Sequence, residues 1–115
     1  MTILEEVNKT LEPLGIPIET GVFTGKVPES YLVITPLADT FALHADNRPE
    51  ADIQEVRISI FTTGNYTSLK RRITNTLLQA EFTITDRRYL NLDTETGYHG
   101  YSIDVQKNYE MEDET

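Results

Sequence analysis

The stretch IQEVRISIFTT, residues 53–63, indicates the fold class of this 115-residue chain. Its apolar residues Val56, Ile58 and Ile60 alternate with polar ones. A period of two is typical of a strand that buries one face and leaves the other open. We therefore expect this strand to belong to a sheet that is covered on one side only.

A second strand is predicted just upstream. The run YLVIT at 31–35 is apolar and β-branched, which favours a buried strand, and Pro36 is expected to end it. Residues 40–45 alternate again, and turn-forming residues follow at 46–49. The sequence thus predicts a long hairpin from about residue 39 to residue 63.

Two segments have helical periodicity. Thr2 can cap the first helix, with Glu5 closing a capping box and Gly15 ending it. A second helix is predicted with Thr67 or Ser68 as its cap. Each helix has one apolar stripe, so each should lie on a sheet. The apolar positions are Ile3, Leu4, Val7, Leu11 and Leu14 in the first helix, and Leu69, Ile73, Leu77 and Leu78 in the second.

The remaining extended segments are expected at 18–23, at 82–90 and, after a turn at 93–97, at 101–109. Strands joined by tight turns pair antiparallel. The predicted fold class is α+β: a single sheet of about four to five strands, antiparallel or mixed, with two helices packed on one face.

Composition limits the classes of protein to consider. The hydrophobic fraction of 38% and the charged fraction of 25% favour one globular domain, expected at 1–109, with a flexible acidic tail at 110–115. The absence of cysteine excludes disulfides, thiolate metal sites and a cysteine nucleophile. No apolar run approaches the ~20 residues of a membrane span, so no membrane association is expected.

Residues suited to catalysis are few. The two histidines are His44 and His99, and Asp46 lies two residues beyond the first, but no third ligand for a metal can be named. Nucleophile motifs and Gly-rich phosphate loops are absent from the sequence. We therefore expect no catalytic residues, no metal, no cofactor and no enzymatic activity.

The charges are segregated although the net charge is −9. Half of the ten basic residues lie within a short segment: Lys70, Arg71, Arg72, Arg87 and Arg88. This segment is either a solvated surface paired with Glu81 and Asp86 or a contact surface between identical copies. A nucleic-acid surface is a weaker alternative, because no aromatic residues are interleaved for stacking and the chain is acidic. Tyr98 and Tyr101 suit an interface or the edge of a core.

The order of elements, together with several short stretches, resembles the tail-completion proteins of long-tailed bacteriophages, which include tail terminators and tail-to-head joining proteins. The likeness covers nearly the whole chain and is one of pattern rather than of a single motif. The stretches that carry it are YLVIT at 31–35, ADNRP at 45–49, VRISIF at 56–61, TGNY at 63–66, RRY at 87–89 and TGYHGY at 96–101.

The resemblance implies a structural subunit that forms a hexameric ring on the tail tube, caps the tube and joins it to the head–tail connector. Its partners would then be copies of itself, the tail tube protein and connector proteins, and its place the virion tail or neck, after assembly in the host cytoplasm. The basic segment is assigned to one subunit edge, and acidic residues of the hairpin to the opposite edge or the tube. The candidate interface residues are Lys70, Arg71, Arg72, Arg87, Arg88, Asp46, Asp52, Glu55, Tyr98 and Tyr101.

Other functions remain open on the sequence. A neck or minor capsid-completion protein could share the same small α+β fold. A small ligand-binding or enzymatic domain would show a pocket with converging polar groups. A nucleic-acid-associated module would bind in a strongly salt-dependent manner.

Overall fold

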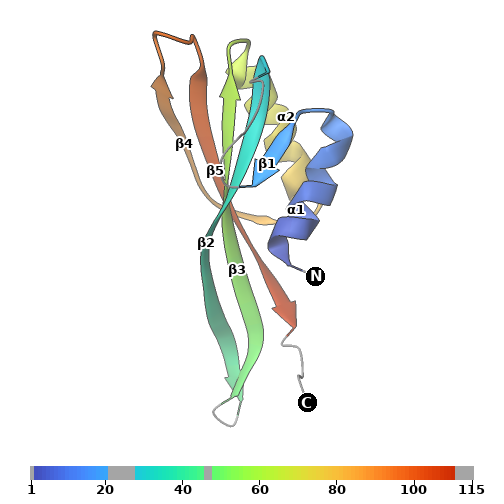
Figure 1. The fold of residues 1–115 in the computed structure, drawn as a ribbon. Coiled ribbons are helices and arrows are strands. Elements are labelled where there is room, and N and C mark those ends of the chain that lie inside the picture. Colours follow the sequence, from blue (N-terminus) through green and yellow to red (C-terminus); the bar gives the residue numbers. More distant parts are fainter. Residues whose placement is uncertain (1, 21–27, 46–47, 111–115) are drawn as a thin grey trace.

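A computed structural model describes residues 2–20, 28–45 and 48–110, with the backbone alone at residues 20, 41–45 and 48–50. Over these residues the strand order is β1-β2-β3-β5-β4, with β1 parallel to β2 and the other neighbours antiparallel (Figure 1). The predicted α+β class is confirmed, and the sheet is mixed. The elements are α1 (Ile3–Leu11), the 3-10 helix η1 (Glu12–Leu14), β1 (Ile18–Thr20), β2 (Ser30–Ala45), β3 (Arg48–Thr62), α2 (Tyr66–Gln79), β4 (Thr83–Leu92) and β5 (His99–Glu110).

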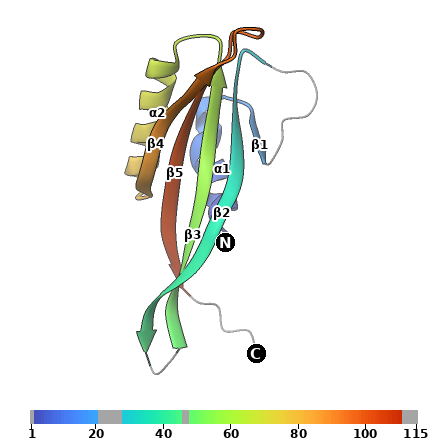
Figure 2. The same ribbon diagram turned by 90° about the vertical axis from the view of Figure 1, so that its left-hand side faces the viewer.

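Both helices pack on one face of the sheet, where the alternating apolar residues meet in rows (Figure 1). Leu32 of β2 pairs with Ile60 of β3, and Ile34 pairs with Ile58. Ile58 in turn pairs with Ile103 of β5. These side chains are fully buried beneath α1 and α2. No described helix covers the opposite side, which we call the uncovered face (Figure 2).

The first helix begins as the sequence predicts. Thr2 is the N-cap, and its hydroxyl accepts a hydrogen bond from the backbone N–H of Glu5 at 3.3 Å. Val7 and Leu11 are fully buried on its inner face. After η1, Gly15 adopts a left-handed conformation with φ of 75°, which glycine reaches without steric cost, and so closes the helical segment.

The second helix differs from the prediction in two respects. Its N-cap is Asn65, whose side chain accepts from the backbone N–H of Ser68 at 3.1 Å, so the predicted caps were wrong. Asn is as good an N-cap as Ser or Thr. Leu78, predicted to lie on the apolar stripe, is 53% exposed, because adjacent helical residues differ by about 100°.

Pro36 does not end a strand, contrary to prediction. β2 continues to Ala45, with a register shift between Pro36 and Ala38. β1 pairs only with Leu32–Ile34, so Pro36 lies where β2 has no described neighbour on that side, and its missing N–H costs no ladder hydrogen bond there. The hairpin is therefore longer than predicted, and Arg48 and Pro49, expected in the turn, belong to β3.

The β2–β3 hairpin runs past the ends of both helices, which makes the molecule elongated, 55 × 25 × 24 Å (Figure 1). β1 covers only the first part of the extended segment predicted at 18–23. At the other terminus β5 includes Glu110, the first residue of the expected acidic tail, which pairs with Ala51. Residues 21–27, 46–47 and 111–115 lie outside the described residues.

A lysine of β5 holds both helices to the sheet. The ammonium of Lys107 donates to Glu6 of α1 and, at 3.0 Å, to the carbonyl of Ala80 at the end of α2. It also lies 4.5 Å from the ring centroid of Phe82. Beside it the Tyr109 hydroxyl donates to Glu6 at 3.4 Å. Burial, followed by the negative charge of Glu6 and this hydrogen bond, raises the pKa of Tyr109.

Candidate assembly site

The lysine and one tyrosine of the candidate interface pack against each other. Lys70 is half-buried on α2, with its ammonium 4.9 Å from the ring centroid of Tyr101 and 6.0 Å from that of Tyr66. These are cation–π distances. Tyr101 is only 8% exposed and belongs to the core. It therefore has little surface to offer a partner.

The four arginines surround one edge of the sheet. Arg71 and Arg72 are exposed on the outside of α2. Arg87 of β4 pairs with core residue Ile103, so it lies on the side of the helices, whereas Arg88 is on the uncovered face. The predicted pairing with an acid is present at one of them, since Arg88 Nε lies 2.7 Å from the carboxylate of Asp86.

The predicted acidic residues do not form the opposite edge. Asp52 and Glu55 lie on β3, the middle strand of the sheet, and Asp46 lies outside the described residues. Strand order depends on pairings between distant segments, which local sequence patterns do not encode. Asp52 accepts a hydrogen bond from Gln54 at 2.9 Å, and Glu55 accepts one from the Thr85 hydroxyl at 2.8 Å.

The edge opposite β4 is nevertheless acidic. It is formed by β1 and by the part of β2 that extends past it. Glu19 lies on β1, Glu29 immediately before β2, and Asp39 on β2. Glu29 and Asp39 are exposed. The two edges of the sheet thus differ in the sign of their charge.

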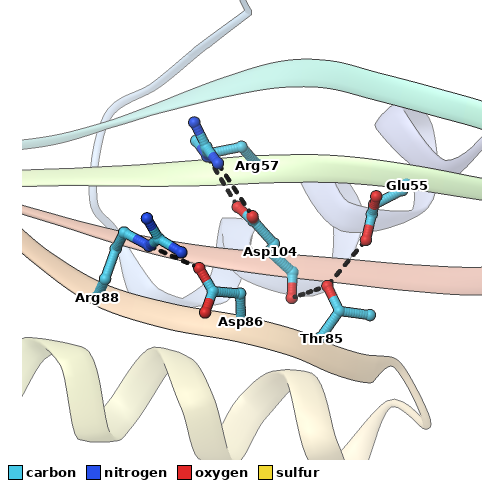
Figure 3. Close-up of polar contacts among 6 residues, drawn as sticks. All are labelled: Glu55, Arg57, Thr85, Asp86, Arg88 and Asp104. Atoms are coloured by element: carbon cyan, nitrogen blue, oxygen red, sulfur yellow. Dashed lines mark hydrogen bonds and ion pairs between the residues drawn. The ribbon is translucent and has the colours of Figure 1, made fainter.

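An ion-pair network crosses the uncovered face (Figure 3). Arg57 of β3 donates two hydrogen bonds to Asp104 of β5, from Nε at 2.9 Å and from Nη2 at 3.1 Å. The hydrogen bonding and the negative charge of Asp104 raise the pKa of Arg57. The Thr85 hydroxyl of β4 lies 3.3 Å from the backbone carbonyl of Asp104. The network therefore links three neighbouring strands on a face that no described helix covers.

A row of residues in register forms a pocket at one end of the uncovered face. Tyr31, Phe61, Gly100 and Asn91 come from β2, β3, β5 and β4, each opposite the next. The rings of Tyr31 and Phe61 stack with centroids 5.0 Å apart. Tyr98 meets Tyr31 edge-on at 5.6 Å. With Asp93 and Thr96 these residues line a cavity of about 330 Å³.

The sequence points to Tyr98 but not to the other residues of this pocket. Asn91, Asp93, Thr96 and Gly100 lie close to Tyr98 in the β4–β5 hairpin, whereas Tyr31 and Phe61 are distant in the chain and are brought to it by the strand register. The one local signal is Gly100 within a strand pattern, because an isolated strand glycine often marks a place where another group approaches closely.

The histidines do not form a metal site in the described part of the chain. His99 Nδ1 lies 3.0 Å from the Tyr89 hydroxyl, and its ring centroid is 4.9 Å from that of Tyr66. The side chain of His44 lies outside the described part. Among the residues that the structure describes, no three His, Asp or Glu side chains are grouped so that they could hold a metal ion. Nor does any described helix have the length and apolarity needed to cross a bilayer.

Comparison with known proteins gives a fold and no family. Neither a protein-family model nor a curated protein matches the sequence. A chain in a structure described as the virion of a native gene transfer agent particle matches over 89% of this chain and 84% of its own, with a TM-score of 0.52 and 13% identity. A second solved chain, named only by an identifier, matches over 98% and 100%, with a TM-score of 0.55 and 13% identity. At this identity the likeness establishes a shared fold: the chain folds like a component of a virion.

Proposed function

We propose that this chain is a structural protein of a phage or prophage virion, and that it completes the tail. In this proposal a ring of identical subunits caps the tail tube and joins the tail to the head connector. The main support for this proposal is the fold, which this chain shares with a component of a virion over most of the length of both proteins. The order of elements in the sequence supports the tail-completion role. Such a protein acts through its contact surfaces, so the proposal includes no catalysis and no cofactor.

Head-to-tail contact between sheet edges would build the ring. One edge presents Arg87 on β4 with Arg71 and Arg72 beside it on α2, and the other presents Glu19 and Asp39. Charges of opposite sign on opposite edges orient identical copies head to tail and speed their encounter. A contact between two different surfaces of the same chain closes into a ring when its rotation permits.

The β2–β3 hairpin is the proposed contact with the tail tube. It runs past the helices, so it reaches beyond the body that would form the ring wall (Figure 1). Asp52 and Glu55 lie on β3 on either side of Gln54, whose side chain accepts from the backbone N–H of Ile3, so both lie where this extension begins. In this proposal the acidic residues of the hairpin contact the tail tube and not the neighbouring subunit.

Deletion of the gene from a phage or prophage tests the role directly. Electron microscopy of the lysate should show full heads beside detached tails, and tails of excess length would assign the capping step to this protein. Restoring the gene on a plasmid should restore joined particles. Normal infectious particles without the gene would refute the proposal.

Charge reversal tests the edge contact. Arg71→Glu and Arg72→Glu each change the net charge by two units on the outside of α2, and each should shift the purified protein from rings toward monomers in native mass spectrometry. Lys9→Glu is the matched control, because it makes the same change on an exposed position of α1, away from the β4 edge. Equal effects of all three variants would show that net charge, and not the edge, governs assembly.

A neck or minor capsid-completion protein is the second candidate. The virion structure with the same fold does not by its description restrict this fold to the tail. The deletion experiment separates the two roles. Loss of a capsid-completion protein should leave heads that have lost their DNA beside tails of normal length, whereas loss of a tail-completion protein should leave the heads full.

A further inference from the structure

We propose that the pocket on the uncovered face binds the guanidinium group of an arginine side chain from a neighbouring protein chain. The pocket exists because a glycine interrupts a row of large side chains. A Cβ atom added to Gly100 would meet Asn91 Oδ1 at 3.3 Å and Phe61 Cε1 at 3.5 Å. Gly100 lines the cavity, so a side chain at this position would crowd Asn91 and Phe61 and narrow it.

One wall of the pocket is aromatic and held in place. Tyr31 and Phe61 are stacked with an interplanar angle of 22°, and Tyr98 stands at 72° to Tyr31. The Tyr98 hydroxyl donates to the backbone carbonyl of Pro28, which fixes its ring. Aromatic ring faces attract cations, and a planar guanidinium can also stack on them. Rings that are already fixed lose little conformational entropy when a ligand binds.

The other wall carries a negative charge and hydrogen-bonding groups. Hydrogen bonds from Thr96 and from the backbone N–H of Glu95 lower the pKa of Asp93, so its carboxylate is ionised at neutral pH. No basic residue in the described part of the chain forms an ion pair with it. Asn91 adds an amide from β4, across Gly100 from Phe61. Ring faces together with a carboxylate and an amide suit a group that is flat, cationic and rich in N–H donors, as guanidinium is.

The size and charge of the site agree with this ligand. A volume of about 330 Å³ is at the lower end of the range for small-ligand sites, enough for the end of one side chain. The net charge of −9 also favours a cationic partner. The inference does not depend on ring formation, because it concerns a pocket that lies within one subunit.

Titration of the full chain with Nα-acetyl-L-arginine amide, followed by NMR, tests the inference. The amide signals of Phe61, Tyr98 and Gly100 should shift in a saturable manner. The neutral citrulline analogue should leave them unchanged at the same concentration, because it keeps the shape and loses the charge. Absence of saturable shifts, or equal shifts with both probes, would overturn the proposal.

Three variants and a second ligand make the test specific. Asp93→Asn keeps the hydrogen-bond acceptor that the turn uses, removes the charge and should weaken binding about three- to fivefold. Glu95→Gln removes one charge from the same turn but outside the pocket lining, so this variant should bind the probe as the wild type does. If Glu95→Gln weakened binding as much as Asp93→Asn, the effect would be one of overall charge, and the proposed site would be refuted. Gly100→Ala, with its fold checked by thermal melting, should bind more weakly. Tighter binding of free L-arginine than of the amide would contradict a protein side chain as the ligand.

Discussion

Replacement of Arg57 by methionine should destabilise the protein by about 2 kcal/mol. Methionine keeps the apolar stem and removes both hydrogen bonds to Asp104, whose side chain is only 9% exposed. Breaking a fully buried ion pair costs about 3–5 kcal/mol. The Arg57 side chain is 39% exposed, so water compensates for part of this loss and the estimate is reduced. For a domain of this size the melting temperature should fall by about 8 °C.

Urea unfolding followed by circular dichroism would measure the loss. The matched control is Arg88→Met, which breaks the more exposed pair with Asp86 on the same face and should cost no more than about 0.5 kcal/mol. The double variant Arg57→Met with Asp104→Leu should recover most of the lost stability, because no buried charge is then left alone. If Arg57→Met costs no more than Arg88→Met, the ion pair is a solvated surface contact and the reasoning fails.

Three further changes test the remaining assignments. Leu77→Ala should lower the free energy of unfolding by about 2–5 kcal/mol because Leu77 is fully buried, and Leu78→Ala by less than about 0.5 kcal/mol because Leu78 is exposed. Similar losses for the two variants in urea unfolding would contradict the orientation of α2. Asn65→Ala should lower stability by about 1 kcal/mol through loss of the N-cap, whereas Thr67→Ala should have little effect. A larger loss for Thr67→Ala than for Asn65→Ala would show that Thr67 is the N-cap, as predicted from the sequence. The pKa of Tyr109 is raised in the folded state, so the stabilisation by its neutral hydroxyl is complete below pH 10 and is lost as the pH rises above 10. The Tyr109→Phe variant should therefore lose less stability than the wild type between pH 9 and pH 11. Parallel losses would show that the Tyr109 hydroxyl does not cause the pH dependence.

The fold class could be predicted because its signals are local. The alternation at 53–63 predicts a strand with one buried face whatever lies beside it. The errors arose where the environment overrides a local rule. Pro36 is a strand breaker in general, yet it is tolerated where β2 has no described neighbour on one side. Asn65 and Thr67 are both competent N-caps, so the local sequence alone does not decide between them.

The candidate sites were harder to predict because they depend on strand order. Nothing near Arg57 in the sequence identifies Asp104 as its partner, 47 residues away. The same holds for Tyr31 and Phe61, whose rings stack only because their strands pair in this register. Identification of the basic segment needed composition alone, but its division between the two faces of the sheet required the register of β4.

The outer edge of β4 also bears on the symmetry of self-association. No described strand pairs with this edge, and Leu90 and Leu92 are exposed on it, so it could add another strand. If two β4 strands paired antiparallel about a two-fold axis near their middle, either Arg87 would lie opposite Arg87 of the other copy or Arg88 would lie opposite its Arg88. Like charges directly opposite each other destabilise a strand pair. The strand therefore disfavours a closed two-fold dimer at this edge and leaves it available for a different surface of the next subunit.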